Sequence, residues 1–173
     1  TSNFTPVEFY NTLLKYQKLA TENKDEQKHF ILAQYCDLNG ARITENINYY
    51  SSIVIDFDSY SGNYEALKEE ITESLLGLNY LYYTTGSHTQ EAPRVRLIIF
   101  TNRNFLTSEK SAILINLTQN FSSDLIMAID QVNSFGNNTL SRLPYKSSDF
   151  EMVYVEGKAY FIGEGNQVVT SQN

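Results

Sequence analysis

Two aspartates, spaced two positions apart at the end of an apolar run, are the residues of this sequence best suited to chemistry. The run at 51–57 is rich in isoleucine and valine, which predicts a buried strand. Because side chains alternate between the faces of a strand, Asp56 and Asp58 point the same way. Carboxylates so close together repel each other, and Mg²⁺ or Mn²⁺, which accept oxygen ligands, would remove that repulsion. The alternative is a strand that ends in two solvated acids before the turn-forming residues 59–62.

Two further apolar segments lead into residues with related chemistry. The run 125–130, which we interpret as a strand, ends at Asp130, and the predicted strand 79–84 leads into a loop that holds His88. The arginines that follow these segments are Arg94, Arg96 and Arg142. This set suits phosphoryl transfer, in which carboxylates hold two metal ions that align a 3′-hydroxyl with the α-phosphate, and His and Arg hold the triphosphate.

Arg94 and Arg96 share one face of a predicted strand at 94–100. Arg96 lies among apolar neighbours, where a guanidinium is costly to bury unless an anion pairs with it. A phosphate group would be such an anion, and so would a carboxylate such as Asp56. The bland alternatives for the other residues are a helix cap or turn acid for Asp130 and a polar loop residue for His88.

Other site classes are not supported. The chain has no Walker-type glycine loop and no Gly-X-Ser-X-Gly motif, which speaks against a P-loop NTPase and a serine hydrolase. Its two histidines are far apart in sequence, so a His-X-His or zinc site is not expected. The single Cys36 cannot form an internal disulfide and suits a reducing cytoplasm.

Length and charge constrain the function further. A chain of 173 residues fits one domain, 1–173, and no apolar run approaches the length of a membrane span, so we expect a cytoplasmic protein without a membrane partner. The net charge of −7 argues against binding nucleic acid by charge alone. Residues 92–146 form the one positive segment, with 6 basic and 3 acidic residues, which is typical of a local phosphate site.

The predicted elements alternate between helices and strands. A capping box at 5–8 opens a first helix, and further helices are predicted from about 63 and from 107 to about 120. Residues 29–36 predict one more strand, and 152–162 predict a terminal hairpin. This order indicates an α+β domain with a mixed sheet.

Three short motifs occur in an order that resembles archaeo-eukaryotic-type primases. Residues 53–58 are similar to the first primase motif, hydrophobic residues followed by Asp-X-Asp, and 86–88 (Gly-Ser-His) to the second. Residues 129–130 are similar to the third, a hydrophobic residue followed by Asp. The closest resemblance is to the primase-polymerase domains of phage, prophage and plasmid replication proteins, whose His loop and later Arg segment read like 83–97 and 141–144.

The resemblance covers about 40–146, including a familiar lead-in at 42–46. It implies a mainly antiparallel sheet flanked by helices, the RRM-like catalytic core, within a longer replication protein. It also implies metal binding by three acids and substrate binding by a second set. The acids are Asp56, Asp58 and Asp130, and the substrate set is Ser87, His88, Arg94, Arg96 and Arg142. Arg142 lies closer to the following proline than is usual in the family.

The implied activity is a metal-dependent nucleotidyltransferase that makes or extends primers on single-stranded DNA from nucleoside triphosphates. Mg²⁺ or Mn²⁺ would be the cofactor, and a helicase or helical accessory domain downstream is a possible partner. Two alternatives stay open from the residues alone. One is a replication protein that binds nucleotide or nucleic acid without turnover, and the other is a two-metal nuclease using the same acids.

Overall fold

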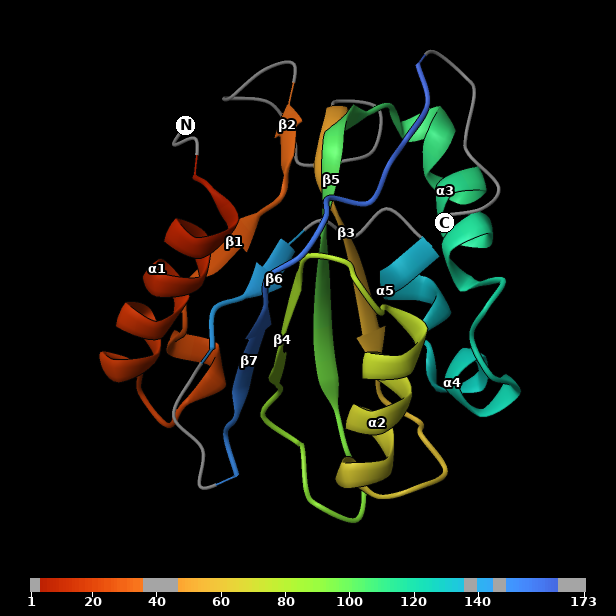
Figure 1. Cartoon of the computed structure of the whole chain (residues 1–173). Coiled ribbons are helices and arrows are strands. Elements are labelled where there is room, and N and C mark those ends of the chain that lie inside the picture. Colours follow the sequence, from red (N-terminus) through yellow and green to blue (C-terminus); the bar gives the residue numbers. More distant parts are fainter. Residues whose placement is uncertain (1–3, 36–46, 136–139, 145–148, 165–173) are drawn as a thin grey trace.

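A central antiparallel sheet with helices on its faces organises the computed structural model, which describes residues 4–35, 47–135, 140–144 and 149–164 (Figure 1). The sheet has the strand order β2-β3-β5-β4-β7, and a separate two-stranded sheet pairs β1 with β6. The predicted α+β class is therefore confirmed. The strands are β1 (His29–Ile31), β2 (Ala33–Tyr35), β3 (Ile47–Phe57), β4 (Tyr80–Thr84), β5 (Val95–Phe105), β6 (Leu140–Arg142) and β7 (Met152–Val155). The helices are α1 (Pro6–Lys18), η1 (Lys24–Glu26), α2 (Tyr64–Ser74), η3 (Thr107–Glu109), α3 (Lys110–Thr118), α4 (Ser123–Ala128) and α5 (Gln131–Phe135).

The sheet separates two apolar layers. The residues of β3 that alternate toward α2, α3 and α4, such as Ile55 and Phe57, belong to the larger core cluster. Residues of the neighbouring strands that point the other way, such as Ile98 and Leu81, pack with α1 in a second cluster. Figure 1 shows α1 on one side of the sheet and α2 to α4 on the other. Each central strand is thus covered on both faces, and polar side chains are left for the strand ends.

The helix starts agree with the capping signals of the sequence. The Thr5 hydroxyl accepts a hydrogen bond from the Glu8 N–H at 3.3 Å, and Pro6 occupies the first helical position of α1. The Asn63 side chain caps α2 in the same way, with 2.9 Å to the Ala66 N–H. The helix predicted from 107 is divided into the 3₁₀ turn η3 and α3.

The segment 125–130 is not a strand, contrary to the sequence prediction. Ser122 caps a helix over Ser123–Ala128 by accepting from the Leu125 N–H at 3.1 Å. Leucine, methionine and alanine, which make up half of this run, are good helix formers. With the Ser122 cap at its start, the run therefore forms a helix and not a strand. Only Ile129, just after the helix, forms an isolated antiparallel bridge with Phe57.

The predicted hairpin at 152–162 is also wrong. Strand β7 pairs with β4, and the following residues leave it to make isolated parallel bridges, Lys158 with Leu78 and Tyr160 with Thr101. Gly157 allows this path, because a Cβ there would lie 2.5 Å from the Leu78 carbonyl oxygen. The glycine therefore marks a close approach of two backbone segments and not a hairpin turn.

The strand predicted at 29–36 is two strands. β1 pairs with β6 in the small sheet, whereas β2 pairs with β3 at the edge of the central sheet. Leu32 lies between them, so the chain passes from one sheet to the other within a single residue. This division places β6, and with it Arg142, beside the end of the central sheet.

Candidate functional site

One row of side chains crosses the end of the central sheet and contains three residues of the predicted site, Asp56, Arg96 and Asp130. In the register of the strands, Asp56 of β3 lies opposite Arg96 of β5, and Arg96 lies opposite Tyr83 of β4. The Phe57–Ile129 bridge extends this row by one position. The Asp130 N–H donates to the Asp56 carbonyl at 2.8 Å, so Asp130 stands opposite Asp56.

The three predicted acids therefore share one face of the sheet at its end. Asp56 and Asp58 lie one pleat repeat apart, and directly opposite residues of an antiparallel pair have neighbouring side chains, which brings Asp130 to Asp56. A second backbone bond, from the Asp58 N–H to the Ala128 carbonyl at 3.0 Å, fixes this register. The intervening Phe57 points into the core and anchors the strand.

Asp56 is paired with Arg96. The Arg96 Nε donates to Asp56 Oδ1 at 2.8 Å, and its Nη2 donates to Oδ2 at 3.3 Å. The two side chains are only 16% and 15% exposed. Burial opposes the charge of the guanidinium, but Tyr83 and Asp56 outweigh it, so the pKa of Arg96 is raised. The ion pair suggested by the sequence as an alternative is present.

Asp130 has a local structural role. Its Oδ1 accepts from the Asn133 N–H at 3.2 Å, and its Oδ2 accepts from the Asn133 side-chain amide at 2.7 Å. Asp130 thus caps α5, which is the bland alternative that the sequence left open. The capped helix in turn supports the site, because the Ser134 hydroxyl of α5 accepts from the Asp56 N–H at 3.0 Å.

The acids suit a divalent cation in the chemistry of their oxygen donors, although two of them already have partners. Carboxylate oxygens are suitable ligands for Mg²⁺ or Mn²⁺, and all three lie on one face. Asp58, whose Oδ1 accepts from the Ser59 hydroxyl, is the least engaged by the rest of the fold. Over the residues that the structure describes, no three His, Cys, Asp or Glu side chains are grouped as a metal site requires. Binding a cation here requires Asp56 to leave Arg96.

A pocket of ≈ 170 Å³ adjoins the ion pair on the β4 side. It is lined by Tyr83, Thr84, Thr85, Gly86, Ser87, Arg96, Arg142 and Leu143. Two of these residues are arginines, and the segment 84–87 consists of small residues whose backbone can approach a ligand closely. The pocket therefore combines positive charge with room for an anion such as a phosphate group.

Ser87 and Arg142, two members of the implied substrate set, line this pocket. Arg142 is held in two ways: its carbonyl accepts from the Tyr83 hydroxyl at 2.8 Å, and its Nη2 lies 3.6 Å from an Asp25 carboxylate oxygen at the surface. Arg94, in contrast, precedes β5 and its side chain is exposed. Arg94 therefore lies just before the strand in which the sequence placed it together with Arg96.

His88 is a buried residue of the loop and is not among the pocket residues. It is only 4% exposed, and its ring packs edge-on against Tyr64 with 4.5 Å between centroids. Its Nδ1 accepts from the Arg94 N–H at 3.1 Å, which ties the middle of the loop to its end at β5. Burial lowers the pKa of His88, against the opposing influence of Asp149 and Glu151, so the ring is neutral at pH 7.

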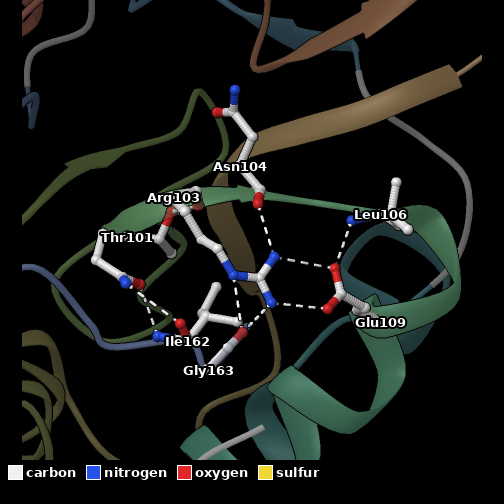
Figure 2. A network of polar contacts seen from close by, with 8 residues as sticks. Thr101, Arg103, Asn104, Leu106, Glu109, Ile162 and Gly163 are labelled. Atoms are coloured by element: carbon white, nitrogen blue, oxygen red, sulfur yellow. Dashed lines mark hydrogen bonds and ion pairs between the residues drawn. The ribbon is translucent and has the colours of Figure 1, made fainter. Parts of the chain in front are cut away.

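The positive segment 92–146 does not form one cluster. At the far end of β5, Arg103 pairs with Glu109, with Nη2 to Oε1 at 2.8 Å (Figure 2). Figure 2 shows the same guanidinium donating to the carbonyls of Asn104 and Gly163, which joins β5 to the C-terminal segment. Lys110 lies over the Tyr50 ring, 4.7 Å from its centroid. The sequence did not predict this network, because Leu106 has no capping side chain and only Glu109 makes its half of a capping box, by accepting from the Leu106 N–H.

Residues 42–46, the predicted lead-in, lie outside the described part of the chain. None of the described helices has both the length and the apolar character needed to cross a membrane.

Comparisons with curated proteins and with solved structures gave no match. A family model, the VapE N-terminal domain, matches residues 4–171. The match does not test primase chemistry, which stays a prediction. The chain therefore belongs to the VapE N-terminal domain family, and VapE is a replication-associated protein of phages and plasmids.

Proposed function

We propose that this domain is a nucleotidyltransferase of the primase-polymerase type, which adds nucleotides to a primer on a single-stranded DNA template. The observation that carries the proposal is the position of the acidic face beside the arginine-lined pocket. Arg96 lines the pocket and pairs with Asp56 of the acidic face, since the two are direct neighbours across β3 and β5. Transfer of a nucleotide from a triphosphate needs anion-binding groups next to carboxylates, and this end of the sheet provides both.

In this proposal the pocket binds the triphosphate. Arg96 and Arg142 make charge-assisted hydrogen bonds to phosphate oxygens, and the backbone of 84–87 lies against them. Asp56, Asp58 and Asp130 would hold Mg²⁺ or Mn²⁺. The bound ions would align the primer 3′-hydroxyl with the α-phosphate and stabilise the pyrophosphate that leaves.

Within this proposal the other residues have a supporting role. His88 ties the loop that forms the pocket wall, because its ring accepts from the Arg94 N–H. The Asp130 cap fixes α5, and α5 holds the Asp56 backbone through Ser134. These contacts restrict the movement of the acids and of the pocket wall, which is what a transfer reaction with fixed geometry requires.

A second function has its own supporting observation. The bidentate Arg96–Asp56 pair neutralises one of the three acids, which suits a domain that binds nucleotide without turnover. Such a domain would bind a triphosphate in the pocket and would incorporate none. A nuclease, in contrast, would shorten labelled DNA in the absence of any triphosphate.

Primer synthesis on single-stranded DNA tests these functions. The assay supplies labelled ribo- or deoxynucleoside triphosphates with Mg²⁺ or Mn²⁺, on unprimed and primed templates. We expect metal-dependent products, and we expect Asp58→Asn to reduce them by a factor on the order of 100 to 1,000, since it removes a carboxylate ligand. The matched control is Glu73→Gln, which makes the same charge change at an exposed position of α2.

Asp58 is preferred to Asp56 for this test because the Asp58 carboxylate has no part in the Arg96 pair. Equal activity of Asp58→Asn and Glu73→Gln would contradict the proposed catalytic site. Triphosphate binding without incorporation, in the presence of either metal, would favour the second function.

A further inference from the structure

Arg96 stands between the two halves of the candidate site. Through Nε and Nη2 it donates to the Asp56 carboxylate at 2.8 and 3.3 Å. Through Nη1 it faces the other way, toward the Tyr83 hydroxyl at 3.3 Å and the Arg142 carbonyl at 3.4 Å. The same side chain lines the pocket. One guanidinium is therefore shared by the acidic face and the anion pocket.

The donors of this guanidinium are almost fully used. A guanidinium has five N–H groups, and the four contacts above commit both of its edges. A phosphate group that binds Arg96 with two hydrogen bonds must therefore displace one set of partners. Asp56 and the phosphate are both anions, so they compete for the same cation.

Of the two possible displacements, the one in which Arg96 leaves Asp56 also frees a carboxylate on the acidic face. When Arg96 turns away, both oxygens of Asp56 become available on the face that carries Asp58 and Asp130. A divalent cation can then neutralise Asp56 in place of the guanidinium. A triphosphate in the pocket and a cation at the acids would thus favour each other through the side chain that they share.

We propose that Arg96 is an exchangeable counter-ion, which holds Asp56 in the ligand-free protein and moves to the triphosphate when the pocket is filled, releasing Asp56 for a divalent cation. This proposal rests on the proposed function, because it takes the pocket as the triphosphate site. It adds a coupling: the acidic face is closed to a cation until the triphosphate arrives.

The exchange is testable without any metal. The probe is inorganic triphosphate in the presence of EDTA, measured by titration calorimetry on the wild type and on four variants. Asp56→Asn removes the competitor for Arg96, so we expect it to bind triphosphate about tenfold more tightly than the wild type. Asp58→Asn is the matched control, with the same charge change on the same face, and we expect it to tighten binding by no more than about threefold. Arg96→Gln and Arg142→Gln should weaken binding.

A second measurement follows Arg96 directly in the wild type. The Nε–H of Arg96, hydrogen-bonded to Asp56, should give an NMR signal that is absent in Arg96→Lys and that shifts when triphosphate is added in EDTA. This measurement decides the matter if Asp56→Asn does not fold, which thermal unfolding would reveal.

The outcomes separate the exchange from the proposed function. Equal tightening by Asp56→Asn and Asp58→Asn, or an Nε–H signal that triphosphate leaves unchanged, would overturn the exchange and leave the pocket as the triphosphate site. No binding by the wild type, or equal binding by the wild type, Arg96→Gln and Arg142→Gln, would instead overturn the pocket and the proposed function with it.

Discussion

Strand β5 carries Arg96 near its start and Arg103 near its end, and each arginine pairs with a carboxylate. Arg103 and Glu109 are surrounded by fixed backbone partners: Glu109 also accepts from the Leu106 N–H at 2.8 Å, and Arg103 also donates to the Gly163 carbonyl. Arg96 and Asp56 have, in contrast, two other acids on one side and a pocket on the other. The same pair of chemical groups therefore closes one end of the strand, whereas at the other end it lies beside the pocket where we propose the exchange of partners.

The two pairs also differ in how the carboxylate is buried. The Glu109 side chain is 3% exposed, whereas that of Asp56 is 15% exposed. A carboxylate that lacks access to water has few alternatives to its arginine, because leaving would strand a buried charge. A partly exposed carboxylate next to a pocket can accept water or a cation instead. We therefore expect substitutions at the Arg103 end to change stability, and those at the Arg96 end to change binding more than stability.

The largest effect on stability is expected from Glu109→Ala. It removes the charge partner of Arg103 and the acceptor of the Leu106 N–H, so the free energy of unfolding should fall by about 3 kcal/mol. Chemical denaturation measures this change, and Glu73→Gln is the control for loss of one negative charge at the surface. A loss below about 1 kcal/mol would show that the Arg103–Glu109 pair contributes no more than a surface ion pair. The proposed difference between the two ends of β5 would then be contradicted.

A smaller effect on stability is expected at the other end of β5. Asp56→Ala leaves the Arg96 guanidinium without its anion and should lower the free energy of unfolding by about 2 kcal/mol. The loss is smaller than for Glu109→Ala because that variant also removes the acceptor of the Leu106 N–H. Asp58→Ala should change it by no more than about 0.5 kcal/mol. Equal losses in the two variants, again by denaturation, would contradict the assignment of Arg96 to Asp56. A variant with alanine at both Asp56 and Asp58 would therefore lose stability as well as carboxylate ligands, and an activity assay on it would not separate the two effects.

Acid should weaken the Arg103 end in a defined direction. The hydrogen bond from Arg103, helped by the Leu106 N–H, lowers the pKa of Glu109 against the effect of burial. A carboxyl with a lowered pKa stabilises the fold above its ordinary pKa, and this contribution is lost as the pH falls through the lowered value. The stability difference between the wild type and Arg103→Gln should therefore shrink as the pH falls from about 7 to about 3. A difference that stays constant over this range would contradict the prediction.

The sequence indicated where the acids lie because the evidence was local. Alternation along β3 places Asp56 and Asp58 on one face, and β-branched residues fix the strand. The class of the fold followed from the same kind of pattern. The capping signal at Thr5 was equally local and is confirmed, and the helix predicted from about 63 starts there, after an Asn63 cap.

Other features depend on contacts that a single segment does not reveal. The run 125–130 is apolar whether it is a strand or a helix, and the Ser122 cap decides for the helix. Asp130 still reaches Asp56, because the residues after α4 bridge to β3. The Arg103–Glu109 network joins three segments, so the basic count over 92–146 could not separate its arginine from those at the pocket.

His88 lies at the pocket end of the molecule but is as buried as Glu109 at the Arg103 end. It therefore tests whether every residue near the pocket acts in binding, or whether a buried one acts in stability. Burial lowers its pKa below the ordinary value. In a window below pH of about 6.5, the unfolded chain therefore binds a proton that the folded ring does not take up. Stability should fall as the pH decreases through this window, and His88→Gln should remove that part of the dependence. Denaturation of both proteins across the window measures this, and it should be the smallest of the four effects. If the two proteins lose stability in parallel, the ring is charged in the fold, which would suit a direct contact with phosphate better than a structural role.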